Sequence, residues 1–205
     1  MAPRNQLRLR RSSTSDRDES GRGRIIRAAA RLFREKGFRA TTVRELAEAA
    51  GMQSGSLFYF FPSKQDILLA VMEQGMAEVH ASVAAAKEGR APAASFRAMV
   101  RRHLEGILEE DSDHMAVMLY ETRSLPAGAG KQVLKMRRDY EALWEAQIEA
   151  LIQQGRWCHP REPRLSRLAL MGALNWSVQW YRPQRGDTPA RLAATLCALF
   201  LREPA

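Results

Sequence analysis

Apolar residues recur at helical spacing along nearly the whole chain, and this period decides the fold class. From Arg24 onward they fall three and four positions apart, as in Ile25, Ala28, Ala29 and Leu32. This spacing places them on one face of a helix. Strand-like alternation never persists beyond a few residues, and no internal repeat of roughly 20–50 residues is visible. The sequence therefore predicts an all-α protein.

Glycines, prolines and capping residues divide this pattern into about nine helices. Gly37 is expected to end the first helix in the left-handed conformation. Thr42, with Glu45 three residues later, predicts a capping box for a second, short helix. Ser54 and Ser63 are the expected caps of the third and fourth helices. Beyond residue 72 the predicted helices span 93–110, 113–123, 131–154, 164–181 and 188–201.

Charge is spread unevenly over the 205 residues. The net charge is +9, and the first 72 residues hold +7 of it. A basic end beside a near-neutral remainder indicates that one end meets a polyanion. We divide the chain into a disordered basic tail (1–21), a small helical domain (22–68) and a larger helical domain (69–205).

Several protein classes are excluded by the same sequence. No apolar run approaches the ~18 residues that a membrane helix needs, so we expect no membrane partner. The Arg- and Ser-rich start lacks the apolar segment of a secretory signal. The two cysteines, Cys158 and Cys197, fit a reducing compartment, and we expect a cytoplasmic protein.

The small helical domain has the spacing of a helix-turn-helix: a short helix, a turn containing Gly51 and a second short helix. The second helix of such a motif lies in the major groove while the first braces against the backbone. Taken singly, each exposed polar residue here has an alternative as a cap or a solvated side chain. Together with the local charge they favour DNA binding. The candidate DNA-binding residues are Thr42, Arg44, Ser54, Gly55, Ser56, Tyr59 and Lys64.

Residues 24–71 resemble the N-terminal DNA-binding domain of the TetR/AcrR family of bacterial repressors. The matching residues are Ala29, Phe33, Gly37, Thr41, Thr42, Val43, Leu46, Ala47, Gly51, Gly55, Ser56, Leu57, Phe61, Ser63 and Lys64. The resemblance implies a homodimer with a three-helix DNA-binding domain and a larger all-α domain for dimerisation and ligand binding. It also implies phosphate contacts from Thr42 and Lys64. The family usually has Tyr where this chain has Phe58, and Tyr59 is the candidate to replace that hydroxyl.

The larger helical domain shows no catalytic spacing. It has no Gly-rich phosphate loop and no pair of metal-spaced cysteines. His103 and His114 lie near Glu110, Asp111 and Asp113, but the irregular spacing favours a solvated acidic loop over a metal site. We expect no catalytic residue, no cofactor and no metal.

Aromatic and polar side chains on its amphipathic helices are candidates for a ligand site. Packing in the core is the alternative for each of them. Polar and aromatic groups alternate around Trp176, and buried amides need partners that a ligand can supply. The candidate ligand-binding residues are His103, Tyr120, Trp144, Asn175, Trp176 and Gln179.

Residues 164–201 also resemble a subgroup of the family, through residues 172–176 and 180–183. That subgroup includes regulators of lipid and steroid catabolism, some of which respond to acyl-CoA thioesters. The resemblance implies a small apolar or amphipathic effector, such as an acyl-CoA or lipid-related molecule. An acyl-CoA requires basic residues at the mouth of its tunnel, and the candidates are Arg97, Arg101, Arg102 and Arg123.

The last two predicted helices carry apolar residues on more than one side. Extra apolar faces indicate a partner, and pairing across a two-fold axis gives a four-helix bundle. The candidate dimer residues are Leu170, Leu174, Val178, Leu192, Leu196, Leu199 and Phe200.

The sequence thus predicts a ligand-responsive repressor that binds a near-palindromic double-stranded DNA operator as a homodimer. Two alternatives stay open. One is an architectural DNA-binding protein without an effector, and the other is an enzyme acting on thioesters in the C-terminal domain.

Overall fold

The computed structural model describes residues 20–109, 113–121, 124–125, 131–158, 162–183 and 186–202. These ranges contain nine α-helices, and their only β-type pairing is an isolated bridge between Trp157 and Leu201. The predicted all-α fold is confirmed. Apart from its last two residues, the predicted tail lies outside the described ranges. The helices are α1 (Gly21–Lys36), α2 (Val43–Ala49), α3 (Ser54–Phe60), α4 (Lys64–Lys87), α5 (Pro92–Leu108), α6 (Asp113–Glu121), α7 (Lys131–Gln153), α8 (Pro163–Trp180) and α9 (Pro189–Phe200).

The caps of the first four helices follow the sequence with two exceptions. Thr42 completes the predicted capping box of α2, and the Ser63 hydroxyl accepts from the Asp66 N–H at the start of α4. Ser54 is not a cap: α3 begins at this residue, and Gln53 precedes it without a side-chain hydrogen bond. Gly37 has φ 81° and ψ 156°, so it adopts a glycine-only extended conformation rather than the left-handed helical one.

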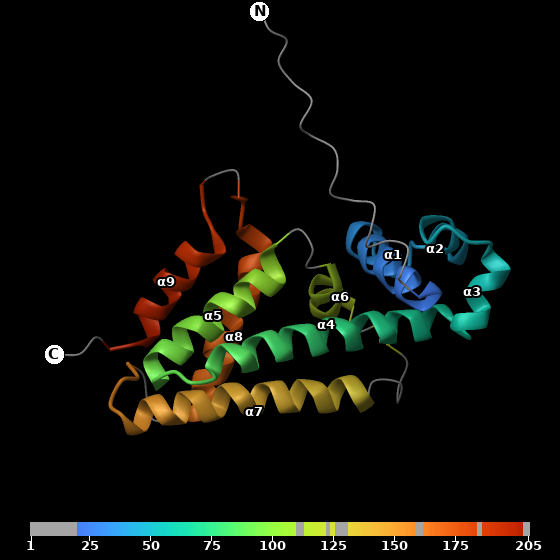
Figure 1. Cartoon of the computed structure of the whole chain (residues 1–205). Coiled ribbons are helices and arrows are strands. Elements are labelled where there is room, and N and C mark those ends of the chain that lie inside the picture. Colours follow the sequence, from blue (N-terminus) through green and yellow to red (C-terminus); the bar gives the residue numbers. More distant parts are fainter. Residues whose placement is uncertain are drawn as a thin grey trace, which may run out of the picture.

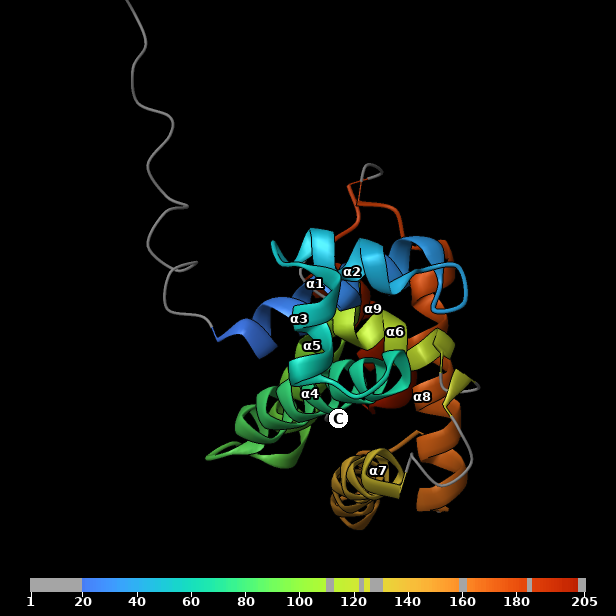
Figure 2. The same cartoon turned by 90° about the vertical axis from the view of Figure 1, so that its right-hand side faces the viewer.

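Helix α4 runs through both hydrophobic cores of the molecule (Figure 1). Its first half, up to Met72, packs with α1, α2 and α3, and its second half, from Met76, packs with α5 and the C-terminal helices. At 24 residues it is about 36 Å long. The predicted domain boundary after residue 68 therefore falls inside a continuous helix. In Figure 2 the three N-terminal helices lie above this helix, with α7 below it.

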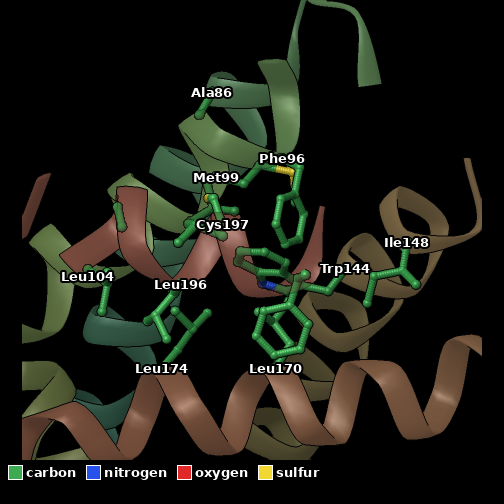
Figure 3. Packing of buried hydrophobic residues seen from close by; sticks show 14 of the residues in the cluster. Ala86, Phe96, Met99, Leu104, Trp144, Ile148, Leu170, Leu174, Leu196 and Cys197 are labelled. Atoms are coloured by element: carbon green, nitrogen blue, oxygen red, sulfur yellow. The ribbon is translucent and has the colours of Figure 1, made fainter. Parts of the chain in front are cut away.

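The C-terminal core is built around Trp144, which is fully buried (Figure 3). Phe96 meets Trp144 and Trp157 edge to face, and Trp157 stacks on Phe200. The apolar stripes of α8 and α9 fill the remaining space. Four predicted dimer residues lie in this core and are buried within one chain: Leu170, Leu174, Leu196 and Phe200.

The assignment of these four residues to a partner surface is wrong, because they form the inward stripe of each helix. On α8 that stripe is Leu170, Leu174 and Ser177. The outward side of α8 and α9 instead exposes large apolar side chains. These are Leu165, Leu168, Trp176, Trp180 and Leu199. Of the predicted set, only Leu199 is exposed, whereas Val178 and Leu192 are half-buried.

Within the ranges above, no helix combines the length and the apolar character required to cross a membrane.

Candidate functional site

Helix α3 presents a small, polar face to solvent. Leu57 is buried and fixes the helix against the N-terminal core, and Phe61 is buried directly after it. On the other side Ser54, Gly55 and Ser56 are exposed, and Tyr59 is 87% exposed. A short helix with an apolar anchor and an exposed face of small residues can enter a groove closely.

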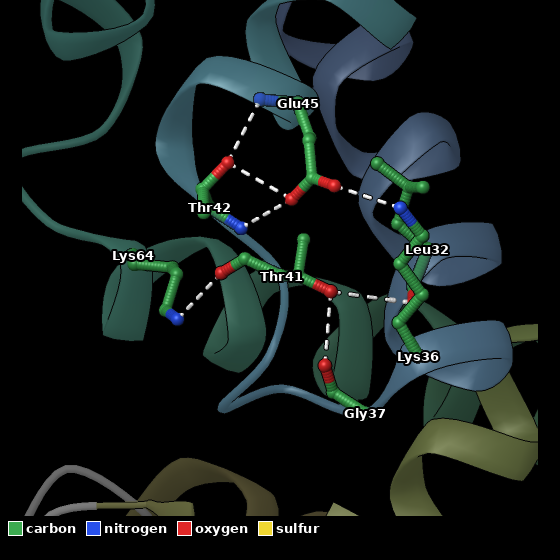
Figure 4. Close-up of polar contacts among 7 residues, drawn as sticks. All are labelled: Leu32, Lys36, Gly37, Thr41, Thr42, Glu45 and Lys64. Atoms are coloured by element: carbon green, nitrogen blue, oxygen red, sulfur yellow. Dashed lines mark hydrogen bonds and ion pairs between the residues drawn. The ribbon is translucent and has the colours of Figure 1, made fainter.

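Thr42 caps α2 through three contacts with Glu45 (Figure 4). The Glu45 N–H donates to Thr42 Oγ1 at 3.2 Å, while the Thr42 N–H and hydroxyl donate to Glu45 Oε2 at 2.8 and 2.9 Å. Lys36 Nζ holds the other carboxylate oxygen at 2.7 Å. The hydrogen bond from Lys36, followed by those from Thr42, lowers the pKa of Glu45 to about 2. The capping role of Thr42 is confirmed, and its phosphate contact stays a prediction.

Lys64 ties the start of α4 to the loop before α2. Its ammonium donates to Phe38 O at 2.8 Å and to Thr41 O at 2.7 Å, and lies 4.4 Å from the centre of the Phe38 ring. The Thr41 hydroxyl in turn donates to Gly37 O at 2.9 Å. Lys64 therefore helps to fix the position of α4 relative to the loop between α1 and α2. Its predicted phosphate contact is untested, as is that of Arg44, which is exposed on α2.

Helix α6 links the two domains. Arg34 Nη1 of α1 donates to Asp113 Oδ1 at 2.6 Å, and the Phe38 N–H donates to Glu121 Oε1 at 2.9 Å. Val117 of α6 and Val133 of α7 belong to the N-terminal hydrophobic core. Both ends of α6 thus form hydrogen bonds with the DNA-binding domain. A displacement of α6 therefore changes its contacts with α1 and with the loop that follows α1.

A closed polar network lies in the C-terminal core. His103 Nδ1 is 2.7 Å from the Tyr140 hydroxyl, and Nε2 is 2.9 Å from Asn175 Oδ1. Because Asn175 Oδ1 can only accept, Nε2 carries the proton and Nδ1 accepts from Tyr140. Burial lowers the pKa of His103 to about 4, and burial raises the pKa of Tyr140 well above its usual value. The network is therefore neutral and joins α5, α7 and α8.

Three of the six predicted ligand residues meet in and beside this network. Asn175 contacts His103, and Trp144 packs edge to face on it with 6.0 Å between ring centres. Trp144 Nε1 is buried and has no hydrogen-bond partner among the described residues. Trp176 is 67% exposed and Gln179 is exposed, whereas Asn175 is half-buried, so a ligand contact of Trp176 or Gln179 stays a prediction. The side chain of Tyr120 is outside what the structure describes.

His114 lies at the start of α6 against α4. It is 9% exposed, and its Nε2 is buried with no hydrogen-bond partner in the described part of the chain. Burial lowers its pKa, while the charges of Glu78 and Asp113 oppose the shift. A cavity of about 240 Å³ reaches it between α4, α5 and α6. The predicted solvated loop is wrong for His103 and His114, and Glu110 and Asp111 are outside the described residues.

A cavity of about 550 Å³ between α4 and α5 forms a basic groove. Its lining includes Arg90, Arg101 and Arg102. Arg101 and Arg102 were among the predicted basic residues of a ligand mouth. Arg97 does not line this groove, and Arg123 lies outside the described ranges.

Sequence reasoning missed the contact between α4 and α6. A Cβ added at Gly75 would lie 2.8 Å from His114 Cβ and 3.0 Å from its carbonyl carbon, so only glycine lets α6 lie this close. A glycine inside the apolar pattern of a helix is the signal that points to such a contact. Among the described residues, no group of three or more His, Cys, Asp or Glu side chains has the geometry of a metal site.

Known proteins match the chain over both domains. The family model "Bacterial regulatory proteins, tetR family" matches residues 25–71, and the model "Tetracyclin repressor-like, C-terminal domain" matches residues 89–203. The HTH-type transcriptional repressor KstR2 of Rhodococcus jostii (strain RHA1) is 32% identical over 187 residues, which cover 88% of this chain and 89% of that protein.

Solved structures share the fold. The superantigen PfiT is 37% identical with a TM-score of 0.78, over 91% of this chain and 98% of that one. AibR, solved with isovaleryl coenzyme A and operator DNA, is 23% identical with a TM-score of 0.81, over 88% of this chain and 97% of that one.

Proposed function

Since the chain belongs to the TetR family of bacterial regulatory proteins and is a ligand-responsive transcriptional repressor, we propose that it binds a near-palindromic operator as a homodimer. An amphipathic effector of the acyl-CoA type releases it from that operator. The single observation that carries this proposal is the exposed, small-residue face of α3 on a helix anchored by Leu57.

The DNA contacts of the proposal come from α2, α3 and the start of α4. Ser56 and Tyr59 read base edges, whereas Thr42 and Lys64 meet phosphates. Arg44, Ser54 and Gly55 complete the surface. Two such surfaces on a two-fold dimer face successive major grooves, so the half-sites lie about 34–36 Å apart.

The dimer of the proposal forms through the outward side of α8 and α9. Trp176, Trp180 and Leu199 are exposed there. Exposed large apolar side chains are typical of interaction sites on proteins, and a two-fold pairing of two helices gives a four-helix bundle. Leu165 and Leu168 extend the same side toward the start of α8.

Effector binding is transmitted by α6 in this proposal. The Arg34–Asp113 ion pair and the bond from the Phe38 N–H to Glu121 join α6 to α1. An effector that prefers a displaced α6 changes the separation of the two α3 helices. Coupling of this kind amounts to about 1–3 kcal/mol, or roughly 5–150-fold in operator affinity.

The acyl-CoA class has a precedent in the shared fold, because AibR was solved with isovaleryl coenzyme A. KstR2, which covers 88% of this chain, is a transcriptional repressor, and no feature of the described residues favours an enzyme. As a repressor acting on operator DNA, the protein works in the cytoplasm.

The test is fluorescence anisotropy with DNA fragments from upstream of the gene. We expect specific binding to an inverted repeat, weakened at least fivefold by an acyl-CoA from a panel of chain lengths. Relief by no acyl-CoA contradicts the effector class, and equal affinity for random DNA contradicts operator reading.

Two variants separate the DNA contacts. Lys64→Ala is expected to weaken binding on all sequences and to lower the salt slope, whereas Tyr59→Ala changes the sequence preference. Circular dichroism melting of Lys64→Ala controls for the loss of its two bonds to Phe38 O and Thr41 O.

A further inference from the structure

The position of the effector is inferred from two neighbouring cavities along α4. Resting on the proposed function, we propose that the effector lies between α4, α5 and α6. Its anionic end occupies the groove of Arg90, Arg101 and Arg102, and its inner, uncharged end contacts His114.

The two cavities are neighbours along α4. The groove of about 550 Å³ and the cavity of about 240 Å³ are both lined by Ser82 and Arg102. From Gly75 in the inner cavity to Ala86 in the groove, they follow about 16 Å of α4. An elongated molecule can therefore occupy both, whereas a compact one fills only one of them.

The outer end favours an anion. Arg101 Nε lies 2.6 Å and Arg102 Nη1 lies 3.0 Å from the two oxygens of Glu105, so one carboxylate balances two guanidinium groups. Arg90 donates to the backbone carbonyls of Ala86 and Glu88, which carry no net charge. The groove keeps a positive excess, and guanidinium forks match phosphate oxygens.

The inner end favours a neutral group with hydrogen-bonding capacity. Glu78, Glu105 and Glu109 line the inner cavity and repel an anion. His114 Nε2 is the one ring nitrogen there that is buried without a partner among the described residues. An amide fits this end, because its carbonyl accepts from His114 and its N–H donates to Glu78. The two ends together select an amphipathic ligand with phosphates outside and an amide-containing arm inside.

Occupation of the inner cavity acts on α6. Gly75 lets His114 lie directly against α4, and the neighbouring Asp113 holds Arg34 of α1. A group inserted beside His114 presses on this contact. The effect of ligand binding is thus transmitted to the DNA-binding domain through the first turn of α6.

The experiment is calorimetric titration of the full-length protein with isovaleryl coenzyme A. Arg90→Gln combined with Arg101→Gln is expected to weaken binding tenfold or more at low salt, and His114→Leu about fivefold. The matched control is Arg137→Gln with Arg156→Gln, because Arg137 pairs with Glu141 as Arg101 does with Glu105, and Arg156 donates to a backbone carbonyl as Arg90 does. This control should bind within twofold of the wild type.

Hydrogen exchange of the same samples gives a second readout. Protection on ligand addition is expected in residues 75–109 and in α6. Unchanged affinity in the groove variants, or protection confined to other helices, overturns this site and leaves the effector class standing. A wild-type protein that binds its operator but no acyl-CoA overturns the effector class, and with it the ligand assigned to the groove.

Discussion

The C-terminal domain contains two buried histidines that differ in how their ring nitrogens are satisfied. Both nitrogens of His103 have partners, Tyr140 and Asn175, inside a filled core. His114 has a buried Nε2 with no hydrogen-bond partner among the residues that the structure describes, and it borders a cavity. Burial lowers the pKa of both, to about 4 for His103.

The difference separates a structural group from a group available to a ligand. A satisfied polar network contributes to stability and fixes one arrangement of the helices. An unpaired buried nitrogen costs about 1–3 kcal/mol in the empty state, and a ligand that pairs with it recovers this cost. We therefore expect variants at His103 to change stability and variants at His114 to change the effector response.

The largest effect is expected for His103→Leu, which leaves the Tyr140 hydroxyl and the Asn175 amide without a partner. We expect the free energy of unfolding to fall by about 4 kcal/mol. His114→Leu removes an unpaired atom instead, and its stability should stay within about 1 kcal/mol of the wild type. Urea denaturation measures both, and equal losses would break the comparison.

The next effect is a dependence of stability on pH. The pKa of His103 is about 4 in the folded protein and about 6.5 in the unfolded chain, so the unfolded chain binds more protons between these pH values. The contribution of neutral His103 to the free energy of unfolding is fully present above pH 6.5. This free energy falls by about 3 kcal/mol as the pH is lowered to 4. His103→Gln should flatten this part of the curve, whereas His114→Gln should retain most of it. Thermal melting across that pH range provides the measurement.

A smaller effect is expected at the contact that positions His114. Gly75→Ala brings a Cβ within 3.1 Å of the His114 backbone, which cannot yield without moving α6. We expect a loss of about 2 kcal/mol and a weaker operator complex in the absence of effector. Gly106→Ala is the control, because its Cβ meets only a Val79 methyl at 3.3 Å. Equal behaviour of the two variants would show that α6 does not depend on this contact.

The smallest effect is expected for Tyr140→Phe, which keeps the ring and removes the hydroxyl that donates to His103. The expected loss is about 1 kcal/mol in urea denaturation. The effector response of the operator complex should not change, since this network is closed. A changed response would place His103 in the ligand site as well.

The fold was predictable because its signals are local. Thr42 with Glu45, and Ser63 before α4, specify helix starts within a few residues of sequence, and both caps are confirmed. Periodicity alone could not decide which side of α8 faces its own core. Leu174 and Trp176 are both large and apolar, and only packing against α5 and α7 makes Leu174 the buried one.

The candidate site was predictable only in part for a related reason. Asn175 and His103 are both predicted ligand-binding residues, but they are far apart in sequence, and the hydrogen bond between them is a product of the tertiary fold. The proximity of His114 to α4 depends on the absence of a side chain at Gly75. The spacing of apolar and polar side chains in the sequence therefore does not predict this close approach of α6 to α4.

The course of α4 also has a consequence for how the molecule unfolds. Ala70, Val71, Met72, Val117 and Val133 complete the N-terminal core, yet all lie beyond residue 68. A fragment cut there would lose these apolar contacts and is not expected to be an autonomous folding unit. The two halves should therefore melt together, in a single cooperative calorimetric transition.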